Sequence, residues 1–264
     1  MSELPGSVRA ALAAFVQRPR ILIGADFDGT LAPFATDPML SRAAPGALTS
    51  LYAAASLPGV TVALVSGREL ETLRTLTAIP RTSPIILVGS HGGQSSLSAV
   101  EGSATFNQVD SARLAAASAD LAEVAAAHPG TRIELKPGAV ALHTRGVDRS
   151  VAAAALAAAM ALSSRHAGVQ VIPGKQVVEL TVVETDKGQA LRALAVARAV
   201  EATAYFGDDV TDERAFAALD PNSGDVTVKV GEGNTLAAYR LETVEDVVKT
   251  LAFIVSMRQS ALGD

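Results

Sequence analysis

The 264-residue sequence contains no cysteine, which excludes disulfides, thiol catalysis and cysteine-ligated zinc. Carboxylates and the four histidines remain as candidate side-chain metal ligands. The sequence also lacks a cluster of Lys and Arg: its 22 basic residues are outnumbered by 27 acidic ones, and the net charge is −5. We therefore expect neither nucleic acid nor an anionic membrane as a partner.

Long hydrophobic runs are absent as well. No charge-free stretch approaches the length of about 18 apolar residues that predicts a membrane span, and the Ala-rich segments are too weakly hydrophobic. Residues 1–17 include Glu3 and lack the pattern of a signal peptide, so they predict a short helix. We expect a cytoplasmic protein. With 49% hydrophobic residues, the chain has enough apolar material for a large core.

Five short runs rich in β-branched residues end in Gly, Ser, Asp or a valine, which is typical of buried parallel strands. They are residues 21–26, 60–66, 85–89, 203–208 and 226–230. Amphipathic helical stretches at 68–76 and 188–200 lie between some of them, and this alternation predicts an open α/β sheet. Ligands of such sheets bind beyond the carboxyl ends of the strands, so Asp26, Ser66 and Asp208 should meet in one crevice.

A different pattern, with an internal repeat, occupies the middle of the chain. An Ala-rich helix at 113–127 precedes two strands that turn at Pro137-Gly138, and a second at 151–162 precedes two strands that turn at Pro173-Gly174. Two helix-plus-hairpin units predict a four-stranded antiparallel sheet with two helices on one face. We interpret this as an α+β cap inserted into a Rossmann-like core. The predicted boundaries are 1–107 and 184–264 for the core domain and 108–183 for the cap.

Strand parity assigns the polar side chains of the predicted cap to one face of its sheet. Ile133 and Leu135 are expected on the helix side, for example, and their neighbours on the other. The polar set is Glu134, Lys136, His143, Arg145, Lys175 and Glu179. A solvated face with weak ion pairs is the simpler interpretation of any one of them. As a set beside a predicted crevice, they favour recognition of a hydroxyl-rich ligand.

Four motifs carry the predicted chemistry. They are Asp26-Phe27-Asp28-Gly29-Thr30, Val65-Ser66-Gly67-Arg68, Asp186-Lys187-Gly188 and Gly207-Asp208-Asp209-Val210-Thr211-Asp212-Glu213. Two carboxylates at the end of a buried strand are unfavourable unless a cation or hydrogen bonds compensate them. Ser-Gly alone usually indicates a helix cap and Asp-Lys-Gly a turn. In this order, each at a strand end or helix start, the motifs resemble those of the haloacid dehalogenase superfamily of phosphotransferases.

The resemblance implies a role for each motif in phosphoryl transfer. Asp26 is expected to be the nucleophile that forms an aspartyl-phosphate, and Asp28 the group that protonates the leaving oxygen and later deprotonates water. Ser66, the main-chain N–H of Gly67 at a helix start, and Lys187 are expected to hold phosphate oxygens. An ion pair that only balances the charge of Asp26 is the alternative interpretation of Lys187, and both can be true of the ligand-free protein.

A cation is required because a carboxylate that attacks a phosphate dianion is repelled by it. Mg²⁺ fits a site made of Asp26, the main-chain carbonyl of Asp28, and Asp208. Asp209 and Asp212 complete the candidate metal-site residues, and we expect them to orient the ligands rather than to bind the ion themselves.

The resemblance is more specific outside these motifs. Gly89-Ser90-His91-Gly92, Glu134-Leu135-Lys136, His143-Thr144-Arg145 and Gly174-Lys175 with Glu179 look like the trehalose-6-phosphate phosphatases, over residues 21–216. That family implies a C2-type cap and Mg²⁺-dependent hydrolysis of trehalose 6-phosphate to trehalose and phosphate, the last step of trehalose biosynthesis. It also implies which residues hold the disaccharide: Glu134, Lys136, His143, Arg145, Lys175 and Glu179. Many relatives have Tyr at the position of Phe27, whose main-chain N–H is expected to face phosphate.

Two alternatives remain open from the sequence. Another sugar phosphatase of the superfamily, acting on a sucrose, mannosylglycerate or hexose phosphate, would use the same core, because cap contacts to hydroxyls decide the substrate. A silent sugar-phosphate sensor is disfavoured, since Asp26, Asp28, Lys187 and Asp208 are all present. His91 is expected to brace a loop, and Arg68 to bond core carbonyls or Asp side chains. The sequence leaves the oligomeric state open, and a monomer is consistent with it.

Overall fold

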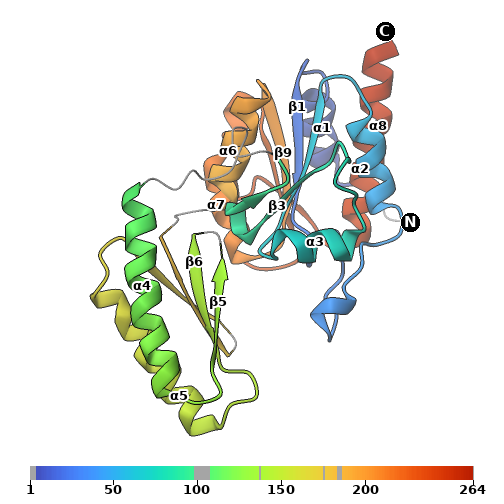
Figure 1. Ribbon diagram of the computed structural model, residues 1–264. Helices are drawn as coiled ribbons and strands as arrows, with labels where there is room; N and C mark the ends of the chain where they lie inside the picture. The colour runs from blue at the N-terminus through green and yellow to red at the C-terminus, as the bar shows by residue number, and fades with distance from the viewer. Residues whose placement is uncertain (1–3, 98–107, 137, 175, 183–185, 264) are drawn as a thin grey trace. The chain divides into compact units, whose positions relative to one another are not determined.

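The computed structural model describes residues 4–97, 108–136, 138–174, 176–182 and 186–263, and it forms two sheets (Figure 1). The chain divides into two units, Met1–Ser103 with Thr185–Asp264 and Ala104–Glu184. The predicted boundaries at 107/108 and 183/184 fall on or beside residues outside the described ranges, so they stay a prediction. Among the described helices, none combines the length and the hydrophobicity of a membrane span.

The sheet of the first unit has seven strands in the order β11-β10-β9-β1-β2-β3-β4. All neighbours pair in parallel except β3 and β4. This confirms the predicted α/β core. The strands are β1 (Ile21–Ala25), β2 (Val60–Val65), β3 (Ile86–Gly89), β4 (Gln94–Ser95), β9 (Ala202–Gly207), β10 (Val226–Val230) and β11 (Tyr239–Leu241). Only β4 and β11 lack a counterpart in the prediction, because strands this short show no periodicity.

Strand β1 lies at the switch point of the sheet. It pairs with β2 on one side and β9 on the other, and Ala25 lies opposite both Leu64 and Phe206. The chain thus leaves β1 in one direction and returns much later on its other side. Because the three strands are parallel, Asp26, Ser66 and Asp208 follow their carboxyl ends at the same edge.

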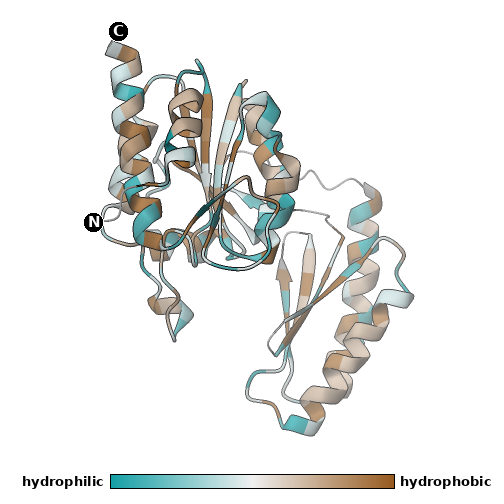
Figure 2. Ribbon diagram, turned by 180° about the vertical axis from the view of Figure 1, so that it is seen from behind, coloured by the Kyte–Doolittle hydropathy of each residue, from teal (hydrophilic) through white to brown (hydrophobic). Residues whose placement is uncertain are grey.

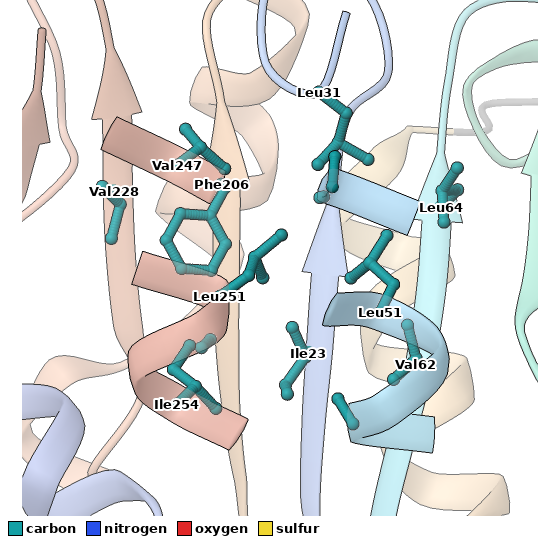
Figure 3. Packing of buried hydrophobic residues seen from close by; sticks show 14 of the residues in the cluster. Ile23, Leu31, Leu51, Val62, Leu64, Phe206, Val228, Val247, Leu251 and Ile254 are labelled. Carbon is teal, nitrogen blue, oxygen red and sulfur yellow. The ribbon is translucent and has the colours of Figure 1, made fainter. Parts of the chain in front are cut away.

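Helices cover both faces of this sheet. One face packs against α1 (Gly6–Phe15), α2 (Ala47–Ala55), α3 (Leu70–Thr77) and α8 (Val244–Gly263), and the other against α6 (Lys187–Ala197) and α7 (Val210–Ala218). Figure 3 shows Leu51 of α2 and Leu251 of α8 beside Ile23 of β1. Burial on both sides explains why the central strands are almost continuously apolar (Figure 2). Short 3₁₀ turns add η1 (Pro38–Leu40), η2 (Ser90–Gly92) and η4 (Pro221–Ser223).

The second unit is the predicted helix-plus-hairpin repeat. Its four-stranded antiparallel sheet has the order β5-β6-β8-β7. The elements are α4 (Gln108–Ala127), β5 (Arg132–Lys136), β6 (Ala139–His143), α5 (Arg149–Ala161), η3 (Leu162–Ser164), β7 (Gln170–Gly174) and β8 (Val177–Thr181). Val140 and Leu180 are buried beneath Leu121 of α4 and Ala155 of α5. Glu134, Ala141 and Glu179 lie side by side on the opposite face.

The structure corrects several local predictions in the cap. Leu135 lies opposite Val140 on the helix side, as predicted, but it is 73% exposed because it lies near the end of the edge strand β5. Arg145 lies in a turn beyond the end of β6, so strand parity does not place it with His143. The second hairpin does not turn at Pro173-Gly174, since β7 continues through Gly174 and Gln176 takes the left-handed conformation (φ 64°).

Candidate active site

Asp26 directly follows the last residue of β1 and is buried, with 6% of its surface exposed. Its Oδ1 accepts the main-chain N–H of Phe27 at 2.7 Å, and its Oδ2 lies 2.8 Å from Lys187 Nζ. The N–H of Phe27, expected to face phosphate, therefore bonds Asp26 here, and the Phe27 ring is buried in the core. The chain then turns at Gly29 (φ +76°), where any Cβ would collide with the Asp208 carboxylate. The first and fourth motifs meet at this glycine.

Lys187 stands in the first turn of α6 with only 1% of its surface exposed. Its Nζ lies 2.7 Å from Asp212 Oδ1 in addition to its contact with Asp26. Burial lowers the pKa of Lys187, but the carboxylates of Asp26 and Asp212 more than offset this, and its pKa is raised above the ordinary value. Lys187 is therefore a charged ammonium held between two acids. It lines a cavity at this edge of the sheet.

Asp212 is completely buried, and four donors occupy its carboxylate. Oδ1 accepts from Lys187 Nζ and from the Tyr205 hydroxyl, each at 2.7 Å. Oδ2 accepts the main-chain N–H groups of Asp208 and Asp209, each at 2.9 Å. Both oxygens are thus committed to orienting the loop and the lysine. Tyr205 had no signal in the sequence, because a tyrosine inside a buried strand is usually ordinary core.

Asp208 and Asp209 have different surroundings although they are adjacent. Asp208 is partly buried, accepts a bond from Thr30 Oγ1 at 3.3 Å, and receives Lys229 Nζ on its main-chain oxygen. Asp209 is exposed and caps α7, where its side chain accepts the N–H of Val210 at 2.6 Å. Of these two residues, only Asp208 has a carboxylate close to those of Asp26 and Asp212.

Three acids of this site could share a cation. Asp26, Asp208 and Asp212 each offer an oxygen, and these oxygens lie within 4.8 Å of one another. Burial raises the pKa of Asp26 to about 7 against the opposing effect of Lys187, and burial with the nearby Asp212 raises the pKa of Asp208 to about 6. Lys187 therefore offsets only part of the cost of burying these two carboxylates in their charged form. Because Asp212 is fully hydrogen-bonded, Asp26 and Asp208 are the side chains able to bind a hard divalent ion.

The second motif lines the same cavity as these acids. A cavity of about 420 Å³ is lined by Asp26, Asp28, Ser66, Gly67, Lys187 and Asp208, among others. Ser66 Oγ accepts the N–H of Arg68 at 3.2 Å, so its hydroxyl hydrogen can be donated elsewhere. The helix predicted to start here begins later, at Leu70, with Glu69 as its N-cap. Ser66 and Gly67 therefore lie in the loop before α3 and not at its N-terminus.

Asp28 is held by a partner that the sequence did not specify. Arg68 approaches it with Nε at 2.6 Å from Oδ2 and Nη2 at 2.8 Å from Oδ1. Ser41 Oγ donates to Oδ1 at 3.0 Å. Arg68 was expected to bond carbonyls or some Asp side chain, and the structure identifies Asp28. Ser41 follows η1 in a loop without a recognisable pattern, so only the fold could show it.

His91 lines the same cavity and its main chain braces the second motif. The N–H groups of His91 and Ser90 donate to the carbonyls of Ser66 (2.9 Å) and Arg68 (2.8 Å). The ring of His91 lies against Gly67, where a Cβ would overlap it. This geometry agrees with the loop brace expected from the sequence.

In the second unit, the structure describes part of the predicted sugar-binding set. Glu134 Oε2 lies 2.6 Å from His143 Nε2 on the sheet face that also carries Glu179. Arg145 is exposed in the turn after β6. Lys175 and the side chain of Lys136 lie outside the described residues.

The class of protein follows from the fold together with this site. A phosphatase of the haloalkanoate (HAD) enzyme superfamily, BT1666 from Bacteroides thetaiotaomicron, shares the fold with a TM-score of 0.57 at 16% identity, over 90% of this chain and 96% of that chain. Residues 24–245 match the trehalose-phosphatase family model, and the chain belongs to that family. The resemblance inferred from the motifs is thereby confirmed.

Two relatives illustrate the family. The trehalose-phosphate phosphatase of Mycobacterium ulcerans is 33% identical over 278 aligned positions, which cover all of this chain and 68% of the relative. The structure of Aspergillus fumigatus trehalose-6-phosphate phosphatase aligns with a TM-score of 0.65 at 25% identity, over 94% of this chain and 97% of that chain.

Proposed function

We propose that this protein hydrolyses trehalose 6-phosphate to trehalose and phosphate with the help of Mg²⁺, as the last step of trehalose biosynthesis. Family membership supports the reaction class and the choice of sugar. The buried contact between Asp26 and Lys187 at the wall of the cavity carries the argument for chemistry. A carboxylate buried at the end of a strand, with a lysine beside it to attract phosphate, is arranged for phosphoryl transfer.

In the first half of the proposed reaction, one Oδ of Asp26 attacks phosphorus. A P–Oδ bond forms, the bond between phosphorus and the sugar oxygen breaks, and its electron pair leaves with that oxygen. Asp28 supplies the proton that turns the departing oxygen into a hydroxyl. Lys187, the Ser66 hydroxyl and the main-chain N–H of Gly67 hold the phosphate oxygens.

In the second half, water hydrolyses the aspartyl-phosphate. Water oxygen attacks phosphorus, the P–Oδ bond of Asp26 breaks, and a water proton passes to Asp28. The carboxylate of Asp26 is regenerated and phosphate is released. The sum is one phosphate ester and one water converted into one alcohol and one phosphate.

The residues present suit Mg²⁺ as the cofactor. Asp26 and Asp208 would hold the ion with the main-chain carbonyl of Asp28, while Asp212 and Asp209 keep that loop in place. Bound Mg²⁺ supplies positive charge where the attacking carboxylate and the phosphate repel one another. Its presence would also compensate the acids whose pKa burial raises.

Recognition of the sugar is assigned to the face of the cap sheet that lies opposite its helices. Glu134, His143 and Glu179 share that face, and hydrogen bonds to hydroxyls discriminate between sugars better than apolar contacts do. Lys136, Arg145 and Lys175 complete the proposed set. The phosphorylated disaccharide is then the partner that this protein binds.

A panel of sugar phosphates tests the proposal. Phosphate release is measured at equal enzyme and excess Mg²⁺ with trehalose 6-phosphate, sucrose 6-phosphate, mannosylglycerate phosphate and glucose 6-phosphate. We expect kcat/KM for trehalose 6-phosphate to exceed that for the others by about 100-fold or more, as expected of a site built to bond hydroxyls. A higher value for a monosaccharide phosphate would contradict the assigned sugar. Tight binding of trehalose 6-phosphate without phosphate release would identify a sensor instead.

A further inference from the structure

The carboxylate of Asp28 has an asymmetric set of partners. Oδ1 accepts two hydrogen bonds, from Arg68 Nη2 and Ser41 Oγ, whereas Oδ2 accepts one, from Arg68 Nε. A carboxylate offers about four lone-pair positions, two on each oxygen. Among the described partners, Oδ1 is saturated and Oδ2 keeps one position open.

Arg68 can hold Asp28 in this orientation because hydrogen bonds fix the main chain of Arg68 at its N–H and at its carbonyl. Its N–H donates to Ser66 Oγ at 3.2 Å, and its carbonyl accepts the N–H of Ser90 at 2.8 Å. The guanidinium contacts Asp28 with two nitrogens, a planar fork that fixes the plane of the carboxylate as well as its distance. Only 17% of the Arg68 side chain and 25% of the Asp28 side chain are exposed.

The loop behind Arg68 is held in an uncommon conformation that maintains this arrangement. Ser90 and His91 both have positive φ, 49° and 54°, which is unfavourable for residues with a Cβ. Gly89 precedes them, and a Cβ there would lie 2.8 Å from the Arg68 carbonyl oxygen and 2.5 Å from Leu70 N. The close approach of two chain segments therefore fixes the base from which the Arg68 side chain extends.

We propose that Arg68, assisted by Ser41, is a positioning residue that presents Oδ2 of Asp28 as the atom that exchanges the proton. Oδ2 gives its proton to the departing sugar oxygen as the P–O bond breaks, and it takes a proton from the attacking water in the second half. The inference rests on the proposed function, because it acts through the acid and base role of Asp28. It adds a reason why one oxygen performs both transfers.

The test compares two leaving groups. Sugar alkoxide needs a proton to depart, whereas p-nitrophenolate is a much weaker base and departs without one. We measure kcat/KM for trehalose 6-phosphate and for p-nitrophenyl phosphate, because kcat/KM reports only the steps up to departure of the leaving group. Asp28→Asn should lower the value for trehalose 6-phosphate by about 100-fold or more, the usual contribution of a general acid, and that for the aryl ester much less.

Arg68→Lys keeps the positive charge and removes the fork, so it tests orientation rather than charge. We expect the same selective pattern, with a loss of about 100-fold for the sugar phosphate, as for a displaced catalytic group. Ser41→Ala should give a smaller selective loss and serves as a second variant if Arg68→Lys does not fold. The double variant Arg68→Lys/Asp28→Asn should be no worse than Asp28→Asn alone, because both changes remove one function.

Arg74→Lys is the matched control. Arg74 lies on α3 and pairs with the largely exposed Glu71 at 3.7 Å, so both substrates should react as with the parent protein. Equal losses on the two substrates in Arg68→Lys and in Ser41→Ala, or additive losses in the double variant, would overturn the positioning role and leave the proposed function intact. Equal losses in Asp28→Asn would overturn the acid role of Asp28, and this inference with it.

Discussion

At the scale of single residues, the site is organised by buried charges that compensate one another incompletely. Lys187 bridges Asp26 and Asp212, while Tyr205 and two main-chain N–H groups complete the shell of Asp212. These contacts occupy both oxygens of Asp212, so Asp26 and Asp208 are the acids left to bind a cation. In the proposed reaction, a cation bound beside these two acids would offset the charge repulsion that opposes attack by Asp26 on phosphorus.

Asp26→Asn tests the nucleophile. An amide is nearly isosteric but cannot form the acyl phosphate, so we expect turnover to fall by about 10⁴-fold or more. Intact-mass analysis after acid quench should detect a phosphorylated protein in the parent enzyme and none in the variant. Asp220→Asn is the control, because Asp220 is an exposed cap of η4 whose function an asparagine can perform. Undiminished phosphate release by Asp26→Asn would refute the assignment.

At the scale of elements, the ends of the chain are joined through one buried arginine. Arg258 of α8 donates to the carbonyls of Val16 (2.6 Å), Arg18 (2.7 Å), Pro19 (2.8 Å) and Pro58 (3.0 Å). The segments between α1 and β1 and before β2 are thereby tied to the last helix. These carbonyls lie outside the regular strands and helices. They therefore accept hydrogen bonds from the guanidinium instead of from a neighbouring strand or helix turn.

Arg258→Ala should therefore destabilise the protein far from the active site. It would remove the guanidinium donor from the buried carbonyl of Val16 and from three partly buried carbonyls, and we expect the free energy of unfolding to fall by about 3 kcal/mol. Urea denaturation measures this, and kcat at low temperature should be unchanged. Lys249→Ala on the same helix removes only a partly exposed pair with Asp246 and should change stability by about 0.5 kcal/mol or less. Similar stabilities of the two variants would contradict the role given to Arg258.

Five strands of the core and its helices α1, α3 and α6 could be predicted because their apolar patterns are local, whereas α2, α7 and α8 had no counterpart in the prediction. β10 agrees with its prediction in both limits, β1, β2 and β3 differ from theirs by one residue at one end, and β9 differs by one residue at each end. The start of α3 and the second hairpin of the cap were placed wrongly. Both boundaries depend on the hydrogen bonds that a loop makes with neighbouring elements. A local sequence pattern does not show these bonds.

At the scale of the whole molecule, pH and cation binding should be coupled to stability. Burial raises the pKa of Asp26 to about 7 and that of Asp208 to about 6, from an ordinary value of 3.8. Between about pH 4 and pH 7 the folded protein then binds more protons than the unfolded chain, so without a cation its stability falls as the pH rises through this window. Below the window both states are protonated and the effect disappears.

Thermal denaturation with EDTA or with Mg²⁺ tests this coupling. We expect Mg²⁺ to raise Tm clearly at about pH 8, where the acids must lose their protons, and much less at about pH 5, where protons compete with the ion. Asp208→Asn should weaken both the pH dependence in EDTA and the response to Mg²⁺. An equal rise in Tm at both pH values would contradict a cation site at these acids.

The sequence by itself determined the α/β core, the antiparallel cap and the four segments that supply the site. These follow from apolar periodicity and from acids, a serine and a lysine placed at strand ends and helix starts, which are properties of neighbouring residues. Parallel strands bring their carboxyl ends to one edge, so the meeting of Asp26, Ser66 and Asp208 was predictable too.

Only the tertiary structure decided which groups complete that site. Tyr205 and Lys229 come from strands whose pattern indicates core, and Ser41 from a loop without a pattern, yet they bond Asp212, Asp208 and Asp28. The pairing of Arg68 with Asp28 spans 40 residues of chain and depends on the turn at Ser90 and His91. Partners of this kind are selected by distance in space, which no local pattern of side chains encodes.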